Sequence, residues 1–116
     1  MIYDLEKIRQ AMADHHPLEN YRVRKRASVL IPLLESEGEI FLMLTRRSTE
    51  MRSHPGQVSF PGGKQDSDEE GAMHTALRET HEEIGLPREK VDVIGRLDQI
   101  LSLHYYLVTP YVGLIP

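Results

Sequence analysis

The 116-residue sequence contains no cysteine, and its aromatic side chains are limited to five tyrosines and two phenylalanines. The absence of cysteine excludes disulfide bonds, thiolate zinc sites and a cysteine nucleophile. The few aromatic side chains, together with a net charge of -4, argue against a nucleic-acid-binding surface.

Long hydrophobic runs are also missing. The apolar run over residues 29–34 is far shorter than the roughly 20 residues that a membrane-spanning helix needs. The first residues lack the basic and then apolar order of a signal peptide. With 40% hydrophobic and 28% charged residues, the sequence predicts one globular domain over residues 1–116, located in the cytoplasm and without a membrane partner.

Hydrophobic periodicity predicts a short helix and several strands. Leu5, Ile8 and Met12 recur at helical spacing, so residues 3–13 are predicted to form an amphipathic helix. Strands are predicted in residues 27–34, 40–45 and 106–115, and residues 89–100 are predicted to form a linker followed by a strand. A polar turn joins the first two strands as a hairpin, and Pro110 predicts an edge or a bulge in the last strand.

The centre of the sequence predicts an acidic helix. Ser67 and Glu70 have the spacing of a capping box at its start, and Gly85 has the character of a residue that ends a helix. One face of this helix is predicted to be buried and consists of Met73, Ala76, Leu77, Thr80 and Ile84.

Three glutamates share a different face of the same helix. Glu79, Glu82 and Glu83 stand at i, i+3 and i+4, where like charges are neighbours and repel each other. A divalent cation would convert this repulsion into binding. The competing interpretation is an ordinary charged surface, on which Arg78 pairs with Glu82 one turn later.

Charge is segregated along the chain. Residues 22–52 contain seven Lys or Arg against four Glu, whereas residues 64–83 contain seven acidic residues against two basic ones. A basic wall opposite an acidic metal site would suit a phosphorylated substrate bridged by the metal. Solvated surface charge is the alternative explanation.

The acidic helix and the glycines before it resemble the Nudix box. The matching positions are Gly63, Glu70, Arg78, Glu79, Glu82, Glu83, Gly85 and Leu86. Six residues rather than five separate Gly63 from Glu70, so that the early glutamate position is filled by either Glu69 or Glu70. Thr80 occupies a position that is apolar in the pattern.

The preceding segment resembles the motif found before the Nudix box in coenzyme A pyrophosphatases. Its matching positions are Leu44, Thr45, Arg47, Ser48, Arg52, Gly56, Phe60, Pro61, Gly62 and Gly63, with Met43 in place of a leucine. Together the two motifs cover residues 43–86 without a gap.

This resemblance implies an α+β fold, an α-β-α sandwich in which helices flank a mixed sheet. The family has further strands and a closing helix beyond this point. The chain is therefore expected to be a fragment that leaves an apolar surface and a strand edge uncovered.

The resemblance also implies hydrolysis of the diphosphate of coenzyme A or acyl-coenzyme A, dependent on Mg²⁺ or Mn²⁺. The expected metal ligands are the carboxylates of Glu79, Glu82 and Glu83 and the backbone carbonyl of Gly62. Arg78 is expected to hold Glu79 and to pair with Glu70. The residues expected to contact the substrate are Arg47, Arg52, Gly56, Phe60 and Gly63.

Three questions stay open at this level. The general base is either a glutamate outside the Nudix box or one of the glutamates within it. The substrate is either coenzyme A or another nucleoside diphosphate derivative such as ADP-ribose. A catalytically inactive module that binds a nucleotide or a partner chain is the third function considered, and the oligomeric state is undetermined.

Overall fold

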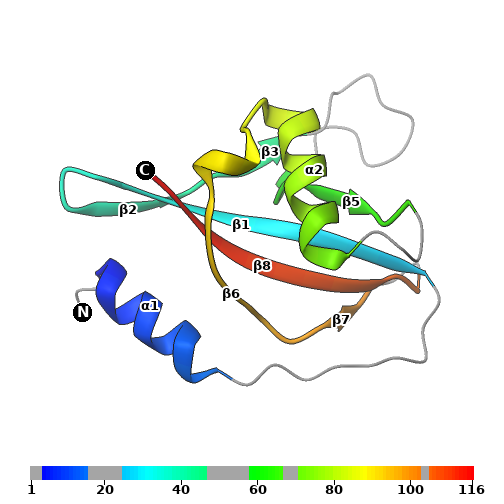
Figure 1. The fold of residues 1–116 in the computed structure, drawn as a ribbon, viewed down its shortest axis with the longest axis horizontal. Helices are drawn as coiled ribbons and strands as arrows, with labels where there is room; N and C mark the ends of the chain where they lie inside the picture. The colour runs from blue at the N-terminus through cyan, green and yellow to red at the C-terminus, as the bar shows by residue number, and fades with distance from the viewer. Residues whose placement is uncertain (1–3, 16–24, 47–57, 67–70, 103–104) are drawn as a thin grey trace.

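The computed structural model describes residues 4–15, 25–46, 58–66, 71–102 and 105–116, and these form a mixed sheet with helices on both faces (Figure 1). The helices are α1 (Leu5–Asp14), α2 (Ala72–Ile84) and the 3-10 helix η1 (Arg88–Lys90). The strands are β1 (Arg26–Ser36), β2 (Glu39–Leu42), β3 (Thr45–Arg46), β4 (Val58–Ser59), β5 (Gly62–Lys64), β6 (Asp92–Arg96), β7 (Ile100–Leu101) and β8 (Leu107–Ile115). The predicted fold class is confirmed, whereas the single-domain organisation stays a prediction.

Strand β1 lies at the centre of the six-stranded sheet. It runs parallel to β8, with Arg26 opposite Leu107 and Leu34 opposite Ile115. Along its other side it pairs antiparallel with β2 and with β5. Strands β6 and β7 pair antiparallel with the far side of β8, and β3 and β4 form a separate two-stranded sheet. The predicted hairpin between the first two strands is confirmed.

Of the two alternatives predicted for Pro110, the sheet edge is wrong, because β8 has neighbours on both sides. A bulge does lie near it, since the register of β6 against β8 shifts between Val93 and Gly95. Pro110 lies opposite Val29 of β1, and its carbonyl accepts a hydrogen bond from the Leu97 N–H at 2.9 Å on the other side. The carbonyl and nitrogen of one strand residue point to the same side of the strand. The side of Pro110 that lacks an N–H therefore faces the gap between the end of β6 and the start of β7. The central strand β8 tolerates a proline there because neither β6 nor β7 pairs with that residue.

Helix α1 covers one face of the sheet, as predicted from its periodicity. The buried side chains of Leu33, Val112 and Leu114 form a cluster there, and Leu5, Ile8 and Met12 of the helix pack against it. The side chain of Asp4 caps the helix by accepting a hydrogen bond from the Lys7 N–H at 2.8 Å.

Helix α2 packs against β1 and β5, and its observed start differs from the predicted one. Its N-cap is Gly71, which offers no side-chain cap, so the predicted start at a Ser67 capping box is wrong. Ser67 and Glu70 themselves lie outside the described residues. The end is as predicted, because Gly85 takes the left-handed conformation with φ of 71°.

The buried stripe of α2 includes Ala76, Leu77 and Thr80, as predicted, but differs from the predicted face at Met73 and Thr75. Met73 is exposed, whereas Thr75 is completely buried beside Ala76 and Leu77. Thr75 and Thr80 satisfy their hydroxyl groups by donating to the carbonyls four residues earlier, Thr80 to Ala76 at 2.7 Å. This internal hydrogen bonding lets both threonines occupy buried positions without an unpaired hydroxyl group.

Strand β2 forms an edge of the sheet and exposes apolar side chains. Phe41 and Leu42 on this strand and Leu44 just after it are about half exposed. None of the described helices has the length and apolar character needed to cross a membrane.

Burial raises the pKa of the Tyr111 phenol above its ordinary value of 10.0, and the nearby charge of Arg96 opposes this only in part. Folding thus favours the neutral phenol, so its contribution to stability is complete below about pH 10 and is lost as the pH rises through the higher folded-state pKa. We expect the fall in Tm between about pH 9 and pH 11 to be smaller in Tyr111→Phe than in the parent protein. Circular dichroism melts at each pH measure Tm. Tyr105→Phe, at an exposed position, is the matched control. An equal dependence of Tm on pH in both variants would contradict this expectation.

Candidate active site

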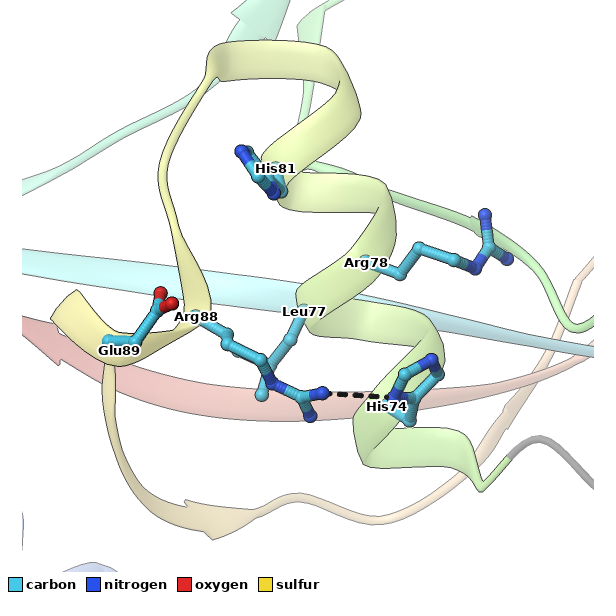
Figure 2. A pocket seen from close by; sticks show the side chains of 6 residues that line it. All are labelled: His74, Leu77, Arg78, His81, Arg88 and Glu89. Carbon is cyan, nitrogen blue, oxygen red and sulfur yellow. Dashed lines mark hydrogen bonds between the residues drawn. The ribbon is translucent and has the colours of Figure 1, made fainter.

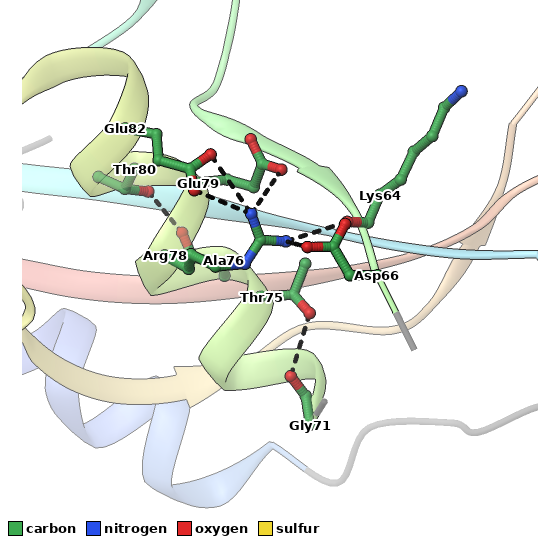
Figure 3. A network of polar contacts seen from close by, with 9 residues as sticks. All are labelled: Lys64, Asp66, Gly71, Thr75, Ala76, Arg78, Glu79, Thr80 and Glu82. Atoms are coloured by element: carbon green, nitrogen blue, oxygen red, sulfur yellow. Dashed lines mark hydrogen bonds and ion pairs between the residues drawn. The ribbon is translucent and has the colours of Figure 1, made fainter. Parts of the chain in front are cut away.

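Arg78 lies at the centre of a polar network that connects α2 to β5 (Figure 3). Its Nη1 donates to Glu79 Oε1 at 3.1 Å and to Glu82 Oε1 at 3.2 Å. Its Nη2 donates to the Lys64 carbonyl at 3.3 Å and lies 3.4 Å from Asp66 Oδ2. The Arg78 side chain is 22% exposed, so this planar group bridges the helix and the strand in a partly buried position.

Gly63 lies directly against the carboxylate of Glu79. A Cβ atom on Gly63 would stand 2.5 Å from Glu79 Cδ and 2.7 and 2.8 Å from its two oxygens. The glycine therefore leaves the space that the carboxylate fills between α2 and β5.

Gly62 serves a different purpose, although it is the next residue. A Cβ atom there would collide with the Ser28 carbonyl oxygen and would stand 2.7 Å from Val29 Cα, both backbone atoms of β1. Gly62 thus permits the close approach of β5 to the central strand.

Glu83 lines a hollow of about 290 Å³ together with Gly62. The hollow is lined by Thr45, Arg46, Ser59, Phe60, Gly62 and Glu83. Pairing of β3 with β4 brings its walls together, and Thr45 Oγ1 donates to the Ser59 carbonyl at 3.0 Å. A carboxylate, an arginine, an aromatic ring and a glycine backbone from distant parts of the chain therefore face one space.

The sequence model of the NUDIX domain family matches residues 24–111. The chain belongs to the Nudix family.

Two curated Nudix relatives show how far the similarity extends. The protein described as uncharacterized Nudix hydrolase NudL of Enterobacter sp. (strain 638) is 50% identical over 93 residues, which cover 80% of this chain and 48% of that protein. The protein of the same description from Yersinia pestis (strain Pestoides F) is 49% identical over 92 residues, covering 79% and 46%. The Nudix chain spans about half the length of these relatives.

Solved structures share the Nudix fold at lower identity. RenU, a Nudix hydrolase from M. smegmatis, superposes with a TM-score of 0.64 and 22% identity, covering 82% of this chain and 63% of its own. A C. elegans Ap4A hydrolase in a binary complex gives a TM-score of 0.65 and 18% identity, covering 78% and 65%. Members of the family generally use divalent metal ions to act on small molecules.

The network around the Nudix arginine contains both of the pairings considered from the sequence. Arg78 holds Glu79, as the family resemblance implied, and it also pairs with Glu82 one turn later. Its expected pairing with Glu70 concerns a residue outside the described part. The contacts of Arg78 with Asp66 and with the Lys64 carbonyl were not foreseen, because they join residues of two elements with no sequence signal between them.

The expected substrate residues are only partly described. Phe60 lines the hollow and Gly63 faces Glu79, whereas Arg47, Arg52 and Gly56 lie outside the described residues. Sequence reasoning missed Thr45, Arg46 and Ser59 as lining residues. Their signal was their position inside the motif of residues 43–63.

Within the described ranges, no three His, Asp or Glu side chains are grouped closely enough to hold a metal ion together. Glu79 and Glu82 are turned to Arg78, while Glu83 lines the hollow with Gly62. The donors are all oxygen atoms, as Mg²⁺ and Mn²⁺ prefer, and Glu79 and Glu83 border the two consecutive glycines. The residues thus suit a hard cation, and the complete ligand set stays a prediction.

A second, smaller hollow is lined by residues of α2 and η1 (Figure 2). It has a volume of about 210 Å³ and is lined by His74, Leu77, Arg78, His81, Arg88 and Glu89. Arg88 Nη1 lies 3.1 Å from His74 Nδ1, which must act as the acceptor because a guanidinium has only donors. No role was predicted for His74 or His81, and this hollow is separate from the one that Glu83 lines.

Proposed function

We propose that this chain hydrolyses the diphosphate bond of coenzyme A or acyl-coenzyme A. Water would add across the bond to give adenosine 3′,5′-bisphosphate and 4′-phosphopantetheine or its acyl derivative. Membership of the Nudix family and the presence of Glu79, Glu82 and Glu83 at their Nudix-box positions support diphosphate hydrolysis.

The observation that carries the substrate choice is the motif over residues 43–63. Its described members Thr45, Phe60 and Gly62 line one hollow with Glu83, although they come from separate segments of the chain. A motif whose residues meet at the catalytic helix is suited to recognising what is cleaved there.

The roles of the residues follow from their contacts. Arg78 positions Glu79 and Glu82 by donating to both carboxylates, so their oxygens have a defined orientation. Arg46 supplies a positive charge at the hollow that favours an anionic diphosphate, and Phe60 contributes an apolar wall.

A divalent cation would be held by the carboxylates of Glu79, Glu82 and Glu83 and the carbonyl of Gly62. When bound, it would neutralise the diphosphate and acidify the attacking water. Gly63 keeps the space in which the Glu79 carboxylate lies.

Phosphorus NMR of coenzyme A and of ADP-ribose, each incubated with the protein and Mg²⁺, tests the proposal. We expect the diphosphate signals of coenzyme A to be replaced by monoester signals at a rate at least about tenfold above that for ADP-ribose, a difference of about 1.4 kcal/mol in transition-state binding. Cleavage of ADP-ribose alone would overturn the coenzyme A assignment and keep a Nudix hydrolase. Binding of a nucleotide without cleavage of either compound would indicate an inactive binding module.

A further inference from the structure

Two lysines converge on one tyrosine ring at one end of the sheet. The ammonium nitrogens of Lys25 and Lys64 lie 5.6 and 5.2 Å from the centroid of the Tyr106 ring. Lys25 directly precedes β1, Lys64 ends β5, and Tyr106 directly precedes β8. These three strands are neighbours, so the cluster is built at one end of the sheet from three separate segments.

The cluster lies on the face of the sheet opposite α2. Lys64 is paired with Ala27, and side chains directly opposite each other on paired strands lie on the same face of the sheet. Lys25 precedes Ala27 by two residues, so its side chain lies on that face as well. Gly63 points to the other face, where it meets Glu79. Figure 3 shows the Lys64 side chain extending away from Arg78.

The positive charge of this cluster is not neutralised by the described part of the chain. In those residues neither Lys25 nor Lys64 forms an ion pair with a carboxylate, and both side chains are exposed. Two ammonium groups that share one ring repel each other, although each is attracted to the ring. An anion between or beside them would relieve this repulsion.

The backbone holds the ring in place and connects the cluster to the catalytic network. The Tyr106 N–H donates to Ser102 Oγ at 3.1 Å, so the residue is anchored where it enters β8. The carbonyl of Lys64 accepts from Arg78, and the preceding Gly63 touches Glu79. A ligand group held by Lys64 is thus one residue away from the backbone that borders the catalytic carboxylates.

We propose that Lys25, Lys64 and Tyr106 form a subsite for a phosphate monoester on the nucleotide half of the substrate. A monoester carries close to two negative charges at neutral pH and so matches two ammonium groups. This assignment rests on the proposed function: the monoester is the 3′-phosphate of coenzyme A, which is separate from the diphosphate that is cleaved. The subsite makes the protein discriminate between coenzyme A and 3′-dephospho-coenzyme A.

The test compares kcat/KM for these two compounds in the parent protein and in Lys64→Gln and Lys25→Gln. The parent is expected to prefer coenzyme A by about tenfold or more, as hydrogen bonds to a charged group allow. Each substitution is expected to remove most of this preference by raising KM for coenzyme A, with little change for the dephospho compound. Lys90→Gln removes the same charge from η1 and is expected to keep the preference.

Binding measurements keep the test independent of turnover. Calorimetry with adenosine 3′,5′-bisphosphate and with adenosine 5′-phosphate should show a preference for the former that Lys64→Gln abolishes. Tyr106→Leu should weaken this preference and Tyr106→Phe should retain it, because the ring positions the lysines. Equal affinity of the parent for both nucleotides, or an equal loss for both in Lys64→Gln, would overturn the subsite. Absence of coenzyme A cleavage with the binding preference intact would overturn only the proposed function.

Discussion

Replacing Glu83 by glutamine is expected to lower kcat for diphosphate hydrolysis by about a thousandfold or more. The amide has nearly the same shape but lacks the charge that a divalent cation needs at the hollow shared with Gly62. Stabilisation by a metal ion is worth several kcal/mol, and about 4 kcal/mol corresponds to a thousandfold change in rate. Phosphorus NMR of coenzyme A with Mg²⁺ measures the rate, and Mn²⁺ titration followed by electron paramagnetic resonance measures the cation affinity.

The matched control for this substitution is Glu89→Gln. Glu89 is an exposed glutamate on η1 and lines the hollow formed by α2 and η1 rather than the one with Glu83. The Glu89→Gln substitution removes the same charge as Glu83→Gln, so activity and Mn²⁺ affinity should stay near the parent values. Retention of activity within about tenfold in Glu83→Gln would remove Glu83 from the metal site.

The substitution Gly63→Ala is expected to reduce activity about a hundredfold while changing Tm little. The new methyl group would stand 2.5 Å from Glu79 Cδ, and the carboxylate would have to move out of its place. Because the displaced group is the end of a flexible side chain, the backbone can stay as it is. A displacement of a catalytic group by about 1 Å is enough for a loss of this size. Steady-state kinetics and thermal melts of the same preparation measure the two effects.

Gly62→Ala is the matched comparison, since it adds the same methyl group at the adjacent residue. Here the methyl group would meet backbone atoms of Ser28 and Val29, which cannot move without separating β5 from β1. The expected result is a loss of about 1–3 kcal/mol in the free energy of unfolding. A stable, active Gly62→Ala variant together with a destabilised Gly63→Ala variant would contradict the assigned roles.

Local patterns predicted those elements whose signals lie within a few residues of each other. The periodicity of Leu5, Ile8 and Met12 identified α1, and Gly85 marked the end of α2. The start of α2 was predicted wrongly because Ser67 and Glu70 have capping spacing, whereas the observed helix begins after Gly71.

Errors in the sheet and in the buried helix face have a common cause. The edge alternative for Pro110 was proposed because proline removes a hydrogen bond, yet the break between β6 and β7 accommodates it inside the sheet. Met73 was assigned to the core, while the packing of α2 on β1 and β5 turned Thr75 inward instead. Both outcomes depend on the neighbouring elements, which a pattern within one segment cannot reveal.

The sequence by itself determined the chemistry that is available. The absence of cysteine, the spacing of Glu79, Glu82 and Glu83, and the glycine pair before them follow from the order of residues alone. Helix geometry predicted that these i, i+3 and i+4 side chains lie together. The family was implied by the resemblance of the whole segment, with Gly63, Arg78 and Gly85, to the Nudix box.

Only the tertiary structure decided which partners each of these groups contacts. It turned Glu79 and Glu82 to Arg78 and left Glu83 at the hollow, and it gave the adjacent glycines unlike neighbours. It also brought Lys25 and Lys64 to the ring of Tyr106. The physical reason is that strand register and helix docking result from packing between distant segments, so contacts across β1, β5, β8 and α2 have no counterpart in local spacing.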